Sequence, residues 1–259
     1  MFRVMLVAQC LSGERVEAAR DLPDGTFACP HCSTAVILKR GRVKVAHFAH
    51  APGAVCDWAR ESATHLLAKR VLADQFRALG YTVNLEESHP KETRRVDVAV
   101  TVPSGHRVAV EIQDSAISVA EMKRRNAADR RSGFFGTVWV FTSARAYRLM
   151  IVGAAHEVRV PDEMRWLANR YGLGIFVINE RDGQMWRCQF GAVVRDGGSS
   201  EWYTPEGELT GEDYPSRMLR TMKTVTATET GFALTARRSR YDKPGHADWA
   251  VVFTVASCM

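Results

Sequence analysis

The sequence predicts a mixed α+β protein, in which a small N-terminal β domain precedes a larger domain built on a mixed sheet. A Cys-x-x-Cys pair, Cys29 and Cys32, lies among short alternating strands near the N-terminus. Further on, alternating valines at residues 94–102 and 107–113 predict two strands, followed by a helix and a third strand. The 259 residues suffice for one large domain or two small ones. We expect domains at residues 1–56 and 57–180, followed by an extension of unknown role at 181–259.

The composition is that of a globular protein, with 46% hydrophobic and 25% charged residues. It excludes the disordered and coiled-coil classes. No apolar run approaches the roughly 18 residues that a membrane span requires. The first residues also turn polar too soon for a secretory signal. We therefore expect a cytoplasmic protein without a membrane partner.

The basic charge is concentrated in the first part of the chain. The net charge is +6, with 22 Lys and Arg against 15 Asp and Glu in residues 1–150, and 13 against 14 in residues 151–259. A basic surplus favours a polyanionic partner, because neutralising phosphates releases counterions. A solvated basic surface explains the charge equally well.

Cysteine and histidine side chains gather between residues 29 and 56. We expect two β-hairpins around them, formed by strands at Val4–Cys10, Arg15–Ala19, Val36–Lys39 and Val43–Phe48. Cys29, Cys32, Cys56 and one histidine make a tetrahedral Cys₃His set suited to structural zinc, in a treble-clef-like or ribbon-like arrangement. His50 is preferred to His47, because it lies beyond the strand and nearer Cys56. The alternatives are a small polar core and, less favoured, a redox site.

A helix with an inward-facing polar line follows. Asp57 is expected to cap a helix that runs to Leu79. Glu61, His65 and Lys69 recur on it at four-residue intervals, and the line continues into an apolar stripe. We expect the three side chains to face the protein. The alternative is an ion pair at the solvent edge.

The two valine-rich strands place two carboxylates opposite each other. A three-residue loop, residues 103–105, pairs Asp97 with Glu111 and keeps both valine sets on one face. Gly105 suits the left-handed position of such a loop. Two neighbouring carboxylates need a counter-ion, and Mg²⁺ is the usual one at phosphate chemistry. A solvated sheet face is the alternative.

The rest of the chain contributes further elements to the expected fold. Helices are expected at Ile117–Arg131 and Asp162–Tyr171, a short helix at Asp213–Thr224, and strands at Thr137–Phe141, Gly174–Asn179 and Gln184–Phe190.

These motifs, taken in order, resemble the CoiA-like competence protein family over residues 1–141. The matching residues are Cys29-Pro-x-Cys32, Lys39-Arg-Gly41, His47-Phe-Ala-His50, Cys56, Glu61-Ser62-x-x-His65-x-x-x-Lys69, Arg95-Val-Asp97-Val, Glu111-Ile-Gln113-x-Ser115 and Trp139. The resemblance implies a zinc-ribbon-like N-terminal domain and a restriction-endonuclease-like nuclease domain of the PD-(D/E)XK type, acting on DNA in natural transformation and recombination.

The resemblance also implies roles for individual residues. Asp97 would be the metal-binding aspartate, and Glu61 the carboxylate contributed by the helix. Glu111-x-Gln113 would stand for the usual Glu-x-Lys, with glutamine replacing lysine.

Together these observations predict a metal-dependent DNA nuclease. Glu61, Asp97 and Glu111 would bind Mg²⁺ or Mn²⁺. Gln113 would orient water or a phosphate oxygen, and His65 would orient Glu61 or contact phosphate. Lys69, or as second choice Lys123, would supply the positive charge missing at position 113. Basic side chains would hold the DNA backbone: Arg94, Arg95, Lys123, Arg124, Arg125, Arg130 and Arg131.

The alternative is a zinc-containing accessory protein that binds DNA without catalysis, within a recombination or phage-defence complex. Gln113 keeps this hypothesis open, whereas the presence of both Asp97 and Glu111 argues against it. The sequence favours neither single- nor double-stranded DNA.

Overall fold

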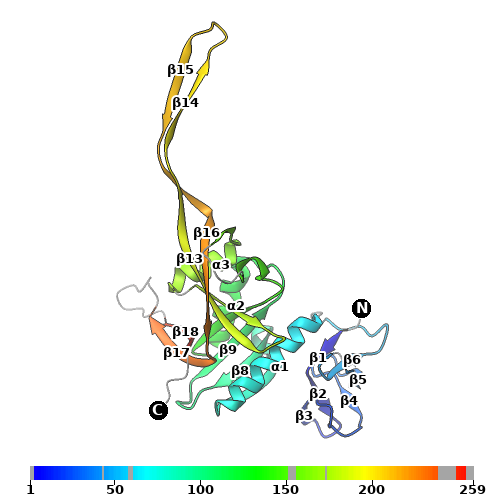
Figure 1. Ribbon diagram of the computed structural model, residues 1–259. Coiled ribbons are helices and arrows are strands. Elements are labelled where there is room, and N and C mark those ends of the chain that lie inside the picture. Colours follow the sequence, from blue (N-terminus) through cyan, green and yellow to red (C-terminus); the bar gives the residue numbers. More distant parts are fainter. Residues whose placement is uncertain are drawn as a thin grey trace.

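The computed structural model consists of a small β domain, a larger domain around a mixed sheet, and a long β arm (Figure 1). It describes residues 3–42, 44–57, 61–150, 156–172, 174–238 and 249–254. This architecture confirms the mixed α+β class. None of the helices in the described residues is long and apolar enough to cross a membrane.

The N-terminal domain is a six-stranded antiparallel sheet with the order β1-β6-β5-β4-β2-β3. Its strands are β1 (Val4–Met5), β2 (Val7–Cys10), β3 (Arg15–Glu17), β4 (Phe27–Ala28), β5 (Ala35–Lys39) and β6 (His47–His50). The expected strand at 4–10 is interrupted at Leu6, whose N–H bonds to Glu86 instead of a strand. The expected strand at 43–48 starts only at His47; Val43 lies outside the described residues.

The larger domain contains an eight-stranded mixed sheet with the order β11-β16-β13-β12-β10-β9-β8-β7. The strands are β7 (Thr82–His89), β8 (Arg94–Thr101), β9 (Arg107–Gln113), β10 (Gly136–Thr142), β11 (His156–Arg159), β12 (Ile175–Asn179), β13 (Gln184–Arg195) and β16 (Arg217–Thr230). β10 runs parallel to β9 and β12, and the other pairs are antiparallel.

Helices cover both faces of this sheet. They are α1 (Ala63–Ala78), α2 (Val119–Arg131) and α3 (Asp162–Tyr171), with 3₁₀ turns η1 (Pro90–Glu92) and η2 (Tyr147–Leu149). Val138 and Val140 of β10 share a core with α1, whereas the intervening Trp139 shares one with α2 and α3. The expected helix start at Asp57 is wrong, because Ser62 is the cap and its hydroxyl accepts the His65 N–H at 3.0 Å.

The β8–β9 hairpin has the register that the valine pattern predicted. Val98 pairs with Val110 and Val100 with Val108. Gly105 has a φ of 83°, and its N–H donates to the Val102 carbonyl at 2.8 Å. A residue without left-handed freedom would strain this turn.

Two strands beyond residue 180 complete the same sheet. β13 pairs with β12, and β16 pairs with β13 and β11. The helix expected at 213–224 is wrong, because residues 217–224 belong to β16, which pairs with β13 over this stretch. The strands β17 (Ala233–Arg238) and β18 (Trp249–Thr254) pair with each other in antiparallel fashion. The ring of Phe253 stacks on the ring of Phe76 in α1, with 6.0 Å between the ring centroids.

The β13–β16 ribbon continues outward as β14 (Gly198–Tyr203) and β15 (Leu209–Tyr214), which pair only with each other among the described strands. We call residues 196–216 the arm. Figure 1 shows the arm projecting far from the rest of the molecule. It contains six acidic residues and no lysine or arginine.

Candidate metal sites and their surroundings

The four residues expected to bind zinc come together in the N-terminal domain. One ligand atom each from Cys29, Cys32, His50 and Cys56 lies within 4.8 Å of the others. His50 Nε2 is 3.4 Å from the Cys32 sulfur. His47 belongs to the same strand but bonds through Nδ1 to the Val45 carbonyl at 2.8 Å. The preference for His50 over His47 agrees with this geometry.

The chemistry of the four side chains fits a zinc ion. Burial raises the pKa of Cys29 to about 12. Burial also opposes ionisation of Cys32, but hydrogen bonds from Thr34 and His50 outweigh it and lower its pKa to about 6. A divalent cation would stabilise all the thiolates together, since zinc binds the deprotonated sulfur.

A second group that could hold a cation lies where α1 meets β8. Glu61, His65 and Asp97 each offer a ligand atom, all within 4.8 Å of one another. His65 Nε2 is 3.1 Å from Asp97 Oδ1, and its Nδ1 is 3.8 Å from Asp114 Oδ1. We call Glu61, His65 and Asp97 the acidic cluster. Glu61 precedes the helix, so the expected helical line holds only for His65 and Lys69.

The acidic cluster is surrounded by cationic groups. Lys69 is fully buried; its Nζ forms an ion pair with Glu61 and lies 4.0 Å from Asp97 Oδ1. Arg95 forms a second ion pair with Glu61. Burial would raise the pKa of Asp97, but His65, Lys69 and Arg95 hold it well below its usual range. Burial would lower the pKa of His65, yet Asp97 and Asp114 raise it to about 10.

Asp97 and Glu111 lie at the point where β8 and β9 separate, which we call the strand fork. The β8–β9 pairs run only as far as Val98 and Val110. Beyond them, side chains replace the ladder: the Ile112 N–H donates to Asp97 Oδ2 at 3.0 Å, and the Asp97 N–H donates to Glu111 Oε1 at 3.3 Å.

The strand fork also breaks the expected valine face. Val98 packs in the core beneath α1, whereas Val96 packs with Ala99 and Phe134 in a separate cluster. The expectation that Val96 and Val98 share one face is therefore wrong. The reason is local, because the Asp97 backbone bonds to a side chain at this point and leaves the regular ladder.

Glu111, expected as a metal ligand, is not one of the three residues of the acidic cluster, and its carboxylate pairs with two arginines. Its carboxylate lies 2.5 Å from Arg94 Nη2 and 3.3 Å from Arg125 Nη1. Burial and the nearby Asp97 charge nevertheless raise the pKa of Glu111 to about 7. Arg94 is buried and also binds Asp129 at 2.9 Å. The expectation that Arg94 holds DNA is therefore wrong, because its guanidinium is committed to internal carboxylates.

Two further residues expected at the site, Gln113 and Lys123, make contacts with residues outside the acidic cluster. Gln113 donates to the Ser115 carbonyl at 3.0 Å. The Lys123 ammonium lies over the Trp166 ring, 5.9 Å from its centroid.

Sequence reasoning missed two carboxylates near the cluster. Asp114 accepts a hydrogen bond from Ser62, the cap of α1, and faces His65. Glu86 on β7 lies 2.5 Å from Lys69 Nζ. The alternation of Thr82, Val83, Asn84 and Leu85 could have revealed β7, but nothing in it indicates that Glu86 points inward.

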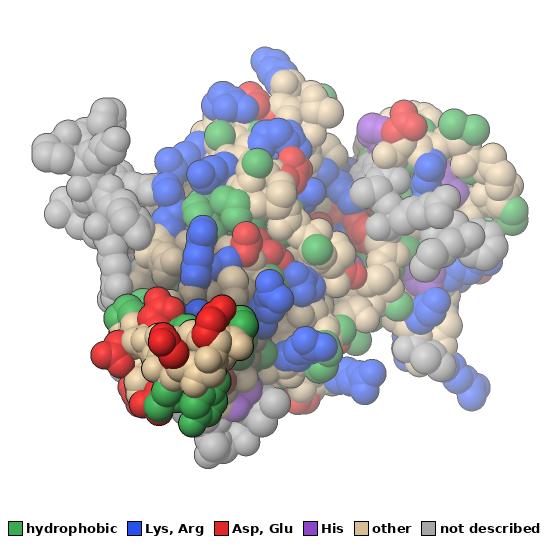
Figure 2. Space-filling model, turned by 90° about the horizontal axis from the view of Figure 1, so that it is seen from above, with side chains coloured by type: hydrophobic (Ala, Val, Ile, Leu, Met, Phe, Trp, Pro, Cys, Tyr) green, Lys and Arg blue, Asp and Glu red, His purple; other side chains and the backbone are tan. Residues whose placement is uncertain are grey.

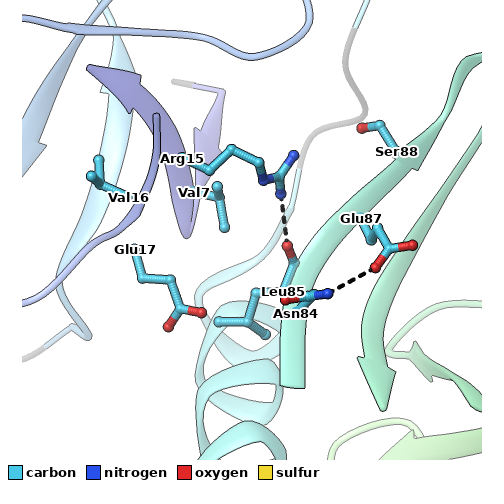
Figure 3. A pocket seen from close by; sticks show the side chains of 8 residues that line it. All are labelled: Val7, Arg15, Val16, Glu17, Asn84, Leu85, Glu87 and Ser88. Atoms are coloured by element: carbon cyan, nitrogen blue, oxygen red, sulfur yellow. Dashed lines mark hydrogen bonds between the residues drawn. The ribbon is translucent and has the colours of Figure 1, made fainter. Parts of the chain in front are cut away.

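A cavity of about 400 Å³ lies between the two domains, outside the acidic cluster. It is lined by Val7, Arg15, Val16, Glu17, Asn84, Leu85, Glu87 and Ser88 (Figure 3). Arg15 of β3 crosses it and donates to the Leu85 and Glu86 carbonyls at 2.9 and 3.0 Å. The cavity thus marks the junction of the two domains.

The fold and the sites define a class of protein: a small β domain with a zinc-type cluster, joined to a mixed α/β domain with an acidic cluster at a strand fork. Residues 9–59 match the family model "Competence protein CoiA, N-terminal domain", and residues 61–154 match "Competence protein CoiA, nuclease-like domain". These matches cover more than half of the chain, which therefore belongs to the CoiA competence protein family. No curated protein and no solved structure matches the chain.

Proposed function

We propose that the protein is a nuclease that uses Mg²⁺ or Mn²⁺ to hydrolyse phosphodiester bonds of DNA. The observation that carries this proposal is the acidic cluster, with its three ligand atoms within 4.8 Å of one another in a nuclease-like domain. A bound divalent ion supplies a water of lowered pKa and neutralises charge on the phosphate.

The chain's own residues would hold the ion and set its surroundings. Glu61 and Asp97 would be the carboxylate ligands, with His65 as the third. An imidazole donor suits Mn²⁺ better than Mg²⁺, so we expect Mn²⁺ to bind more tightly. Lys69 is fully buried and pairs with Glu61, so we assign it to balancing the charge of the carboxylates before a cation binds instead of contacting DNA directly.

The proposed setting is DNA processing during natural transformation or recombination, as the family name indicates. Exposed basic side chains such as Arg124 and Arg130 would contact the DNA backbone. Recombination or defence proteins are the proposed protein partners, and structural zinc in the N-terminal domain is part of the same proposal.

Specific observations favour a second candidate, a DNA-binding accessory protein without catalysis. The charge of Glu111 is balanced by Arg94 and Arg125, and the amide nitrogen of Gln113 is bonded to Ser115. Such a protein would bind DNA and leave it uncut.

Cleavage assays separate the two candidates. Wild-type protein and the Asp97→Asn variant are incubated with single- and double-stranded DNA, with Mg²⁺, with Mn²⁺ and with neither. We expect divalent-dependent cleavage that falls at least about a hundredfold in Asp97→Asn, because a metal ligand is lost. Binding to DNA should be retained or strengthened, since a negative charge near phosphate is removed.

Asp74→Asn is the matched control, because Asp74 is an exposed carboxylate on α1 that faces Arg77. It should cleave like the wild type. Folded wild-type protein that binds DNA but cuts none of these substrates would favour the accessory protein. Cleavage that survives Asp97→Asn would place the active site elsewhere.

A further inference from the structure

A buried carboxylate joins the N-terminal domain to the acidic cluster. Glu86 has no exposed surface, although its neighbours Leu85 and Glu87 both pair with β8. Its backbone is left-handed, with a φ of 51°, a conformation that is costly for a residue other than glycine. This turn directs the Glu86 side chain into the protein.

The Glu86 carboxylate has partners on both sides of the domain junction. On one side, Leu6 N–H donates to Oε1 at 3.0 Å and Val7 N–H donates to Oε2 at 3.3 Å. On the other side, Lys69 Nζ lies 2.5 Å from Oε1. Arg15 of the N-terminal domain also donates to the Glu86 carbonyl at 3.0 Å.

Lys69 is in turn shared between Glu86 and the acidic cluster. Its ammonium pairs with Glu61 and lies 4.0 Å from Asp97. An ammonium and a divalent cation compete for the same carboxylate oxygens. Because the Glu86 carboxylate attracts the Lys69 ammonium, the ammonium competes less strongly for the oxygens of Glu61 and Asp97, which can then bind a cation.

We propose that Glu86 is a positioning residue through which the docked N-terminal domain sets the cation affinity of the acidic cluster. Leu6 and Val7 fix the carboxylate, the carboxylate holds Lys69, and the position of Lys69 decides how strongly it competes with the cation. This inference rests on the proposed cation site. It adds that the N-terminal domain is a working part of that site.

The test is Mn²⁺ binding to the full chain, measured by loss of the free-Mn²⁺ electron paramagnetic resonance signal. The Glu86→Gln variant should bind Mn²⁺ about tenfold more weakly, because Lys69 moves fully onto Glu61 and Asp97. The Glu86→Gln, Lys69→Met double variant should recover the wild-type affinity, because the competing ammonium is gone. Lack of recovery would mean that the first substitution damaged the site by misfolding, and would overturn the proposal.

Glu86→Asp separates position from charge. It keeps the negative charge but is one methylene shorter, so it cannot reach the Leu6 and Val7 N–H groups and Lys69 together. We expect it to weaken Mn²⁺ binding in the same direction as Glu86→Gln. Wild-type affinity in Glu86→Asp would show that only the charge matters and would overturn the positioning role.

Two control substitutions change other carboxylates near the junction of the domains. Glu87→Gln changes the next carboxylate of β7, which faces Arg107. Glu17→Gln removes a contact between the domains, at Arg70 and Arg77, in which the Lys69 ammonium takes no part. Both should keep wild-type Mn²⁺ affinity. Equal weakening in Glu17→Gln would assign the effect to docking in general and contradict a specific role of Glu86.

A gentler substitution serves if Glu86 variants do not fold. Arg15→Met removes the hydrogen bonds to the Leu85 and Glu86 carbonyls and leaves the carboxylate in place. It should weaken Mn²⁺ binding in the same direction, by less than tenfold. Unchanged affinity would count against the proposal. If the wild type binds Mn²⁺ but none of these variants changes it, this inference fails; if the wild type binds none, the proposed cation site fails.

Discussion

Charged side chains at the acidic cluster and the strand fork form ion pairs, each between a cationic and an anionic group. Lys69 and Arg95 face Glu61, and Arg94 faces Glu111. Buried charges require such partners, because an unpaired charge away from water costs several kcal/mol, of the order of 3–5. A cation that binds the cluster must therefore displace or redistribute these partners.

His65 provides a prediction at the scale of one residue. Its pKa is raised to about 10 in the folded protein by Asp97 and Asp114, against burial, and an unfolded histidine has a pKa near 6.5. Protonated His65 therefore stabilises the fold fully below about pH 6.5. This contribution declines as the pH rises and is lost above about pH 10.

Thermal unfolding from pH 6 to 10.5, without added Mg²⁺ or Mn²⁺, tests this linkage. The melting temperature of the wild type should fall with rising pH more steeply than that of His65→Gln, and the two curves should converge near pH 10. His106→Gln is a control, because His106 is exposed in the β8–β9 loop and should follow the wild type. Parallel curves for wild type and His65→Gln would contradict the raised pKa.

The strands of the N-terminal domain are short. β1 and β4 have two residues each, too few for a sheet to be stable by itself. A small core around Phe27 and Phe48 contains two of the candidate zinc ligands, Cys29 and Cys56. A metal that ties three separate segments together would supply the missing stability.

The prediction at this scale concerns the zinc cluster. Cys29→Ser should lower the zinc content from about one ion per chain and unfold residues 3–57, because metal binding and folding are coupled in small domains. Metal analysis and amide hydrogen exchange measure the two effects. Cys10→Ser is the control, since Cys10 is outside the cluster. Wild-type protein purified without chelator but with less than about a tenth of a zinc ion per chain would rule out structural zinc.

Charge is divided unevenly over the whole molecule. Figure 2 shows acidic and hydrophobic side chains on the arm and many basic ones on the body around it. The arm carries Asp196, Glu201, Glu206, Glu208, Glu212 and Asp213. Since the net charge of the chain is +6, the remainder carries +12. For the proposed DNA partner, the negative charge of the arm would oppose the attraction exerted by the positive charge of the body.

Removing the arm tests this balance. Arg195 and Arg217 are paired across the ribbon, so an Asn-Gly turn can replace residues 196–216. The melting temperature should not change, because β14 and β15 form a sheet of their own. DNA affinity should rise, with a steeper salt dependence, because six negative charges are gone.

A charge-only variant is the matched control for the truncation. It keeps the arm and converts the six acidic residues to Asn or Gln. It should raise DNA affinity as much as the truncation does. If the truncation weakens DNA binding while the amide variant strengthens it, the arm itself contacts DNA and the repulsive role is wrong.

The sequence by itself determined the elements whose pattern is local. The β8–β9 register followed from its valines and Gly105, because this register places the paired valines of the two strands together in one core. The helix at Asp162–Tyr171 followed from its periodicity. The Cys₃His set followed from ligand spacing, and the family from the order of short motifs.

Tertiary structure decided what depends on partners distant in the chain. Glu86 meets Leu6 and Lys69 only when the two domains dock, and Glu111 turns to arginines because β8 and β9 separate beside it. Residues 213–224, which form the end of β15 and the start of β16, were expected as a helix, since a ribbon that is largely exposed lacks a buried face that fixes its period. The direction of a buried charged side chain depends on which opposite charge lies nearest in space. The spacing of residues along the sequence does not say which charges become neighbours in the fold.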